Sequence, residues 1–314
     1  MSSVARPGVS VVIIAQDEEA HIGPCLESAA WADQVVVVDG GSRDRTAEIA
    51  ASLGARVHRN PWPGFSVQRE VSLGLATQEW MFALDADERV PPALAQEILD
   101  VVQSGGKSRH GYFVYRDNYF LGRHIKHCGW GQRPVLRLFR RGYGRADGRI
   151  VHEGFVVDGL VGQLANHLVH DSHPTLPEYI ENMNRCTTLE ARESIALGVR
   201  RSWLPPIGPL WRAARRWLNS DRGYQSAYAI LKDELKNRHE WLPLQPFAPL
   251  LRFLQMYILQ RGFLDGRHGL YLSLLSAVYV FVKQIKLWDL RRAARASAGA
   301  SPVISGEGRI RLHG

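Results

Sequence analysis

The chain has 314 residues, of which 45% are hydrophobic and 22% charged, a composition that excludes a disordered chain and is typical of a globular protein. The formal net charge of +8 favours an anionic partner: a nucleic acid, an anionic membrane surface or a phosphorylated substrate. Three scattered cysteines, Cys25, Cys128 and Cys186, cannot form a complete disulfide framework, which suits a reducing cytosol. The first residues lack the apolar core of a signal peptide, so we expect a cytoplasmic protein.

Short apolar runs alternate with helical segments in the first hundred residues. We expect strands at 10–15, 35–38, 55–58 and 80–84, separated by helices that reach residue 30 and cover 46–53 and 67–76. Such alternation indicates βαβ units and a parallel sheet that binds ligands at the carboxyl edge of its strands. Acidic residues follow three of these strands: Glu18, Asp39 and the pair Asp85 and Asp87.

The second half of the chain has a different pattern. Residues 111–169 are rich in aromatic residues and glycine, as expected of a mixed sheet with long loops, and helical periodicity dominates from residue 176. In the apolar region 250–290 the longest uncharged stretch, 269–282, has 14 residues. Since a span needs roughly 17–25 residues, we expect no segment long enough to cross a bilayer.

The sequence Asp85-Ala86-Asp87 follows the fourth expected strand. Two carboxylates can lie close together only if one is protonated or a cation lies between them, and an Asp-x-Asp pair commonly holds Mg²⁺ or Mn²⁺ against a diphosphate. A polar turn is the simpler interpretation of the pattern. A phosphatase with a nucleophilic Asp is disfavoured, because such enzymes usually carry the motif after their first strand.

Four further groups could carry chemistry. The turn Asp39-Gly40-Gly41-Ser42 could present helix amides to a nucleotide or be only a tight turn. His124 to Cys128 lacks the second His/Cys pair of a zinc finger. Glu153, in Val151-His152-Glu153, could be a general base or a surface residue. One of three later histidines could reach a metal, although a capping or core role is an equal alternative: His167, His170 and His173.

These motifs together resemble glycosyltransferase family two, which has the GT-A fold, an α/β fold with a Rossmann-like, mostly parallel sheet flanked by helices. The resemblance rests on Asp17-Glu18-Glu19, Val37 to Asp44, Trp62 to Arg69 and Leu84 to Arg89. Within the family, the chain is most similar to the lipopolysaccharide core β-1,4-glucosyltransferase subgroup. The stretches that carry the closer similarity are Gly129-Trp130, Arg137 to Arg140, Val151 to Glu153 and Gly262 to Gly266.

The resemblance implies roles for individual residues. Glu18 and Asp39 would contact the ribose and uracil of a UDP-sugar, and Gln68 and Arg69 would orient the diphosphate or the sugar. Asp87 would be the direct ligand of a divalent metal, Mg²⁺ or Mn²⁺, with Asp85 beside it at the diphosphate and His170 as a candidate further ligand. Ala15 and Ala86 complete the expected nucleotide-sugar site, and Glu153 is the candidate catalytic base.

The resemblance also implies a domain plan. A catalytic domain would occupy 1–175, with a nucleotide-sugar half at 9–110 and an acceptor half at 111–175. A helical, basic and aromatic region at 176–295 would lie close to the membrane, or pack as a solvated basic helix on the catalytic domain, and 296–314 would be a disordered tail.

The implied activity is inverting transfer of a hexose, expected to be glucose, from a UDP-sugar to a lipopolysaccharide core or other glycolipid acceptor. The enzyme would be cytoplasmic and peripheral on the inner face of the bacterial inner membrane, held by its anionic surface. The alternative is a polyprenyl-phosphate or other cell-envelope polysaccharide glycosyltransferase. A nucleic-acid-binding protein would leave the acidic strand ends unexplained, so no nucleic acid partner is expected. A catalytically silent UDP-binding scaffold would leave the metal site unused.

Overall fold

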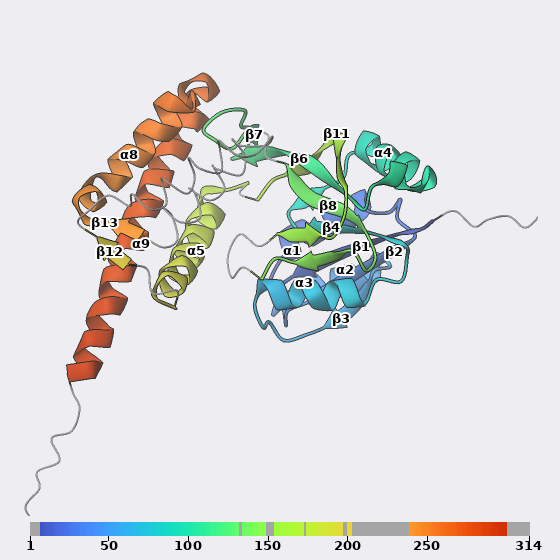
Figure 1. Ribbon diagram of the computed structural model, residues 1–314, viewed down its shortest axis with the longest axis horizontal. Coiled ribbons are helices and arrows are strands. Elements are labelled where there is room, and N and C mark those ends of the chain that lie inside the picture. The colour runs from blue at the N-terminus through green and yellow to red at the C-terminus, as the bar shows by residue number, and fades with distance from the viewer. Residues whose placement is uncertain are drawn as a thin grey trace, which may run out of the picture. The chain divides into compact units, whose positions relative to one another are not determined.

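A mixed β-sheet organises the computed structural model, which describes residues 7–131, 134–148, 154–172, 174–196, 200–202 and 239–299. The chain divides into two compact units. The first unit consists of Met1–Cys186 and Pro249–Val278, and the second consists of Thr187–Ala248 and Tyr279–Gly314. The sheet belongs to the first unit, and the α/β class expected from the sequence is confirmed (Figure 1).

The first half of the sheet is parallel, as the alternating pattern predicts. Its elements are β1 (Val9–Ala15), α1 (Glu19–Ser28), β2 (Gln34–Asp39), α2 (Thr46–Ser52), β3 (Arg56–Arg59), α3 (Phe65–Gly74) and β4 (Trp80–Asp85). Strand β1 lies between β2 and β4, with Ala15 level with Asp39 and Ile14 level with Asp85. The acidic ends of β2 and β4 therefore flank the end of β1 at one edge of the sheet.

The second half of the sheet adds antiparallel pairs. The elements of this part of the chain are β5 (Glu88–Arg89), α4 (Pro92–Gln103), η1 (Gly105–Ser108), β6 (Gly111–Phe120), β7 (Arg123–His124), β8 (Val135–Arg140), β9 (Gly144–Ala146), β10 (Phe155–Val157) and β11 (Val161–His170). Strands β9 and β10 pair only with each other, in a separate two-stranded sheet. The sheet runs in the order β3-β2-β1-β4-β8-β6-β11-β5, and β8 is antiparallel to both β4 and β6. Strand β5 pairs with the end of β11, so that His170 lies level with Glu88, next to the end of β4.

Alternating side chains of the strands fill a core on each face of the sheet. On one face, Val11, Ile13 and Phe82 pack against α1, α2 and α4. On the other face, Val12 and Ala83 pack against α3 and the hairpin of β9 and β10. Because successive strand residues point to opposite faces and both faces are covered, β1 and β4 are nearly continuous apolar runs.

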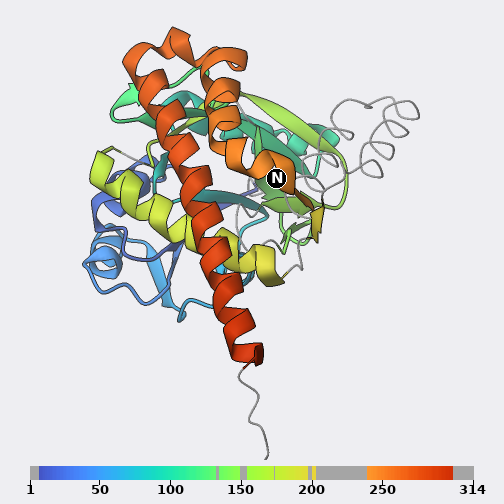
Figure 2. The ribbon, with the colours of Figure 1, turned by 90° about the vertical axis from the view of Figure 1, so that its left-hand side faces the viewer.

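Helices make up most of the described chain after β11. They are α5 (Leu176–Ala196), η2 (Leu242–Phe247), α8 (Ala248–Leu254), the π-helical turn η3 (Gln255–Leu259), η4 (Gly262–Asp265) and α9 (Gly266–Gly299). Two short strands, β12 (Arg200–Ser202) and β13 (His239–Trp241), pair with each other. Figure 2 shows α9 as one unbroken helix.

The expectation that no segment is long enough to cross a bilayer is wrong. By length and composition alone, the helical segment Gly262–Arg295 qualifies as a candidate span, since an 18-residue window within it has a mean hydropathy of 1.4. The count of uncharged residues stopped at Lys283, but a helix can carry a few charges if they point away from its apolar side. Lys283 does so, because its ammonium group pairs with Glu190 at 2.6 Å.

Candidate functional site

Asp85, at the end of β4, is held by two buried arginines. Arg69 of α3 donates to one of its carboxylate oxygens and Arg137 of β8 donates to the other. Arg137 also contacts Oε1 of Glu88 at 2.6 Å, and Oε2 of Glu88 accepts the backbone N–H of Asp85 at 3.0 Å. Burial alone would raise the pKa of Asp85, but Arg137 and Arg69 outweigh it and hold that pKa well below its usual value. Asp85 therefore stays ionised, with both oxygens occupied by guanidinium groups.

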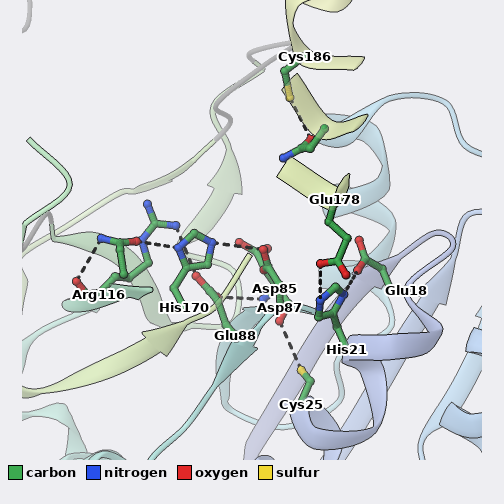
Figure 3. A network of polar contacts seen from close by, with 12 residues as sticks. Glu18, His21, Cys25, Asp85, Asp87, Glu88, Arg116, His170, Glu178 and Cys186 are labelled. Atoms are coloured by element: carbon green, nitrogen blue, oxygen red, sulfur yellow. Dashed lines mark hydrogen bonds and ion pairs between the residues drawn. The ribbon is translucent and has the colours of Figure 1, made fainter. Parts of the chain in front are cut away.

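Asp87, two residues further on, faces His170 instead. Its Oδ2 lies 3.3 Å from Nε2 of His170, and its backbone carbonyl accepts the N–H of Asp171 at 3.1 Å. Figure 3 shows Asp85 and Asp87 beside His170 on one side and His21 on the other. Burial would lower the pKa of His170, but the Asp87 carboxylate outweighs it and raises that pKa.

Asn118 of β6 fixes the tautomer of His170. Its side-chain Nδ2 donates to the carbonyl of Trp130 at 2.6 Å, so its Oδ1 must be the atom that lies 2.7 Å from Nδ1 of His170. An amide oxygen can only accept, so Nδ1 carries the proton and Nε2 has the lone pair when the ring is neutral. A lone pair and a carboxylate oxygen would then face each other at 3.3 Å.

Two states can relieve that repulsion. Either the ring takes a second proton, or a cation lies between Nε2 and Asp87. Imidazole and carboxylate are both ligands for divalent metals, and a backing hydrogen bond to the other ring nitrogen is the usual support for a ligating histidine. The pair Asp87 and His170 therefore fits a metal. Among the residues that the structure describes, no three His, Cys, Asp or Glu side chains are grouped to hold one, so further ligands must come from elsewhere, such as a substrate phosphate.

Glu18 borders an acidic groove next to this pair. Its Oε2 lies 2.9 Å from Nδ1 of His21, whose Nε2 lies 4.0 Å from Glu178 of α5. Desolvation is the main cause of a raised pKa of Glu18, to which the negative charge of Asp87 adds. The groove has a volume of about 670 Å³ and is lined by Asp17, Glu18, Glu19, Ala20, His21, Asp44, Ile49 and Glu178.

Asp39 is fully buried and holds the turn that follows β2. Its Oδ1 accepts the backbone N–H of Ser42 at 3.1 Å, and its Oδ2 accepts that of Gly41 at 3.2 Å. Both glycines of the turn are needed: a Cβ on Gly40 would lie 2.5 Å from the ring of Trp62, and Gly41 has a φ of 91°. Asp39 thus shapes the loop beside Ala15 at the sheet edge.

The other expected site residues are spread more widely. Arg69 is at Asp85, as described, whereas the buried Gln68 pairs with Asn60, whose Nδ2 donates to it at 2.7 Å. Ala86 is buried between the two aspartates. Glu153 and His173 lie outside the described residues, so the structure does not place the candidate base.

The cluster His124 to Cys128 has partners within the protein. Asp265 of η4 accepts the backbone N–H groups of Lys126 and His127, at 3.3 and 2.8 Å, and contacts the His127 ring at 3.0 Å. Cys128 is buried, with its sulfur 3.6 Å from the carbonyl of Gly269. Asp265 therefore fastens this loop, which ends at Trp130.

Sequence reasoning did not assign a role to four polar residues of the site: His21, Glu88, Asn118 and Arg137. Arg137 had a detectable signal, because it is the one charge within the apolar strand segment 135–139 and must find a buried partner. Asn118 had none, since its role depends on a contact with the Trp130 carbonyl that only the fold creates.

Comparison with known proteins shows similarity to glycosyltransferases. Residues 10–154 match the model for Glycosyl transferase family 2. The lipopolysaccharide core biosynthesis glycosyltransferase LpsC of Rhizobium meliloti (strain 1021) is 29% identical over 304 residues, which cover 95% of this chain and 97% of LpsC. An uncharacterized glycosyltransferase of Rickettsia bellii (strain RML369-C) is 35% identical over 117 residues, or 37% of this chain and 39% of that protein.

Among solved structures, glucosyl-3-phosphoglycerate synthase from Mycobacterium tuberculosis, in complex with Mn²⁺, UDP and glucosyl-3-phosphoglycerate, is 23% identical. The overlap covers 36% of this chain and 44% of that chain, with a TM-score of 0.30. The family match and the near full-length similarity to LpsC point the same way. Residues 10–154 are thus similar to Glycosyl transferase family 2, and the chain over nearly its whole length is similar to a lipopolysaccharide core glycosyltransferase.

Proposed function

We propose that this glycosyltransferase moves a hexose, glucose being the expected one, from a UDP-sugar to a lipopolysaccharide core or other glycolipid acceptor, with inversion at the anomeric carbon. The observation that carries the proposal is the pair Asp87 and His170, 3.3 Å apart beside a buried arginine cluster. The name of LpsC supports the acceptor class. A polyprenyl-phosphate acceptor is the alternative.

A Mg²⁺ or Mn²⁺ ion would be held by Asp87 and His170 together with diphosphate oxygens of the donor. When bound, the metal would offset the negative charge that builds on the departing UDP. Asp85 would act through its two arginines, since both of its oxygens are already occupied.

The arginines supply the complementary charge. Three guanidinium groups, those of Arg69, Arg116 and Arg137, surround the two carboxylates of Asp85 and Glu88, with Arg116 3.5 Å from Glu88. These three cations balance the carboxylates of Asp85, Glu88 and the neighbouring Asp87, and guanidinium groups are favourable partners for a diphosphate. The groove at Glu18 would take the nucleoside, because carboxylates accept hydrogen bonds from ribose hydroxyls.

Glu153 would remove the proton from the acceptor hydroxyl as that oxygen attacks the anomeric carbon on the face opposite UDP. Its neighbours support this assignment. Phe155, two residues later in the chain, packs against the site, with its ring centre 5.6 Å from the guanidinium carbon of Arg69.

Release of UDP from a panel of UDP-sugars, measured with Mg²⁺, with Mn²⁺ and with a chelator, tests the proposal. We expect metal-dependent turnover of one UDP-hexose, and its loss in Asp87→Ala. Asp100→Ala, on the exposed face of α4, is the matched control and should behave like the unmodified protein. Full turnover in the chelator or in Asp87→Ala would refute the metal assignment.

Two further measurements separate the alternatives. Thermal stabilisation by UDP and Mn²⁺ without turnover of any sugar would indicate a silent scaffold. Transfer of labelled sugar to a polyprenyl phosphate, and not to lipopolysaccharide core, would favour the alternative acceptor.

A further inference from the structure

Helix α9 exposes an apolar face. Between residues 271 and 288, all of which are described, every exposed side chain is apolar or aromatic. These side chains are 44–54% exposed and recur at intervals of three and four residues, which places them on one side of the helix. We call them the outer stripe: Tyr271, Leu274, Val278, Phe281, Ile285 and Trp288.

The charged residues of the same segment point the other way. Lys283 pairs with the buried Glu190 of α5 at 2.6 Å. The ammonium of Lys286 donates to the hydroxyls of Thr187 and Thr188, at 2.9 and 2.7 Å. In a helix on the surface of a soluble protein the polar side faces water, and here that order is reversed. An apolar surface of this extent indicates an apolar partner.

Cations extend the outer stripe at its carboxyl end. The same spacing continues from Trp288 to Arg292 and Arg295, and Arg292 lies over the Trp288 ring at 5.0 Å. Trp288 and these arginines, with Arg291, line a small hollow of about 190 Å³. Tryptophan favours the depth of lipid headgroups, and arginines there are attracted to anionic phosphates.

We propose that the outer stripe inserts into the surface of an anionic phospholipid membrane, with α9 lying along the membrane and Arg292 and Arg295 among the headgroups. The stripe is roughly 26 Å long at 1.5 Å per residue, and an interfacial helix buries such a face to a depth of about 5–10 Å. This inference adds a membrane-binding face to the proposed function. It rests on the proposed function only in assuming that the acceptor is a glycolipid.

A second copy of the chain fits the stripe less well. Its spacing of three and four is that of a coiled-coil seam, but a parallel pair would place Arg292 and Arg295 against their own counterparts. A span across the bilayer also fits less well, because α5 covers the side of α9 that carries Lys283 and Lys286. An anionic lipid surface can bury the apolar side chains of the outer stripe and also pair with Arg292 and Arg295.

Flotation of the full chain with vesicles tests the proposal. We expect binding to vesicles of phosphatidylethanolamine with 30% phosphatidylglycerol and little binding to pure phosphatidylcholine. Phe281→Asp combined with Ile285→Asp should lower the bound fraction at least tenfold, and Arg292→Glu combined with Arg295→Glu should remove the preference for anionic lipid. Leu160→Asp is the matched control, because Leu160 is 61% exposed, lies outside α9, and should leave binding unchanged.

Four other outcomes would contradict the proposal. Unchanged flotation of the Phe281/Ile285 variant would show that the stripe does not meet lipid. Conversion of a dimer to a monomer by that variant would assign the stripe to a second copy, and loss of its circular dichroism would mean that the chain itself covers this face. Resistance of the bound protein to alkaline carbonate would indicate a span.

Release of UDP without vesicles, measured on the same variants, separates this inference from the proposed donor chemistry. The stripe variants should keep that activity. If the protein binds vesicles as expected but turns over no UDP-sugar, the proposed donor is wrong and the proposed membrane-binding face is still supported.

Discussion

Replacement of Arg137 by methionine should destabilise the protein strongly. The guanidinium group is 6% exposed and lies between Asp85 and Glu88, of which Glu88 is fully buried. Removing one partner of a buried ion pair typically costs about 3–5 kcal/mol, because the remaining charge stays buried without compensation. Asp85 keeps Arg69 and Glu88 keeps Arg116 at 3.5 Å, so we expect the lower end, about 3 kcal/mol.

Urea unfolding followed by circular dichroism measures the effect as a shift of the midpoint. Arg45→Met is the matched control, since Arg45 pairs with Glu48 at 3.3 Å on the surface and should cost less than about 1 kcal/mol. Adding Glu88→Met to Arg137→Met should recover part of the loss, because the uncompensated charge is then gone. If Arg137→Met costs no more than the control, the reasoning about the buried network fails.

Three further substitutions test the candidate base, the support of His170 and the turn after β2. Glu153→Gln should lower transfer by roughly 10²–10⁴ with donor affinity little changed, and loss of donor binding at unchanged turnover would make Glu153 a binding residue. Asn118→Ala should weaken Mn²⁺ binding in the presence of UDP by about 10–100-fold, measured by electron paramagnetic resonance, and unchanged affinity would separate His170 from the metal. Gly40→Ala should cost about 1–3 kcal/mol in urea unfolding, because the new methyl group meets Trp62, and a neutral effect would show that the turn can relax.

The strands and helices of the first hundred residues could be predicted because their signal is local. Short apolar runs and the breakers between them mark the strands of this region, and parallel pairing then brings Asp39 and Asp85 to one edge. The partners of each carboxylate could not be predicted in this way. Arg137 and His170 reach the aspartates through strands 52 and 83 residues further along the chain, and no local pattern encodes that approach.

The same limit explains the error about α9. Counting uncharged residues treats every lysine as an interruption, whereas the direction of its side chain decides whether it disturbs the apolar face. That direction depends on Glu190, which lies 93 residues earlier in the chain.

The contact of Asp265 with the loop before Trp130 sets an order of events during synthesis. The backbone N–H groups of Lys126 and His127 donate to the carboxylate of Asp265, which lies 138 residues after His127 in the chain. A growing chain folds its amino-terminal parts first, so the sheet can form on the ribosome before this fastening exists. Trp130, whose carbonyl orients Asn118 and through it His170, gains its fixed position only after η4 has emerged. The proposed metal site at Asp87 and His170 should therefore remain incomplete in a nascent chain until η4 has emerged.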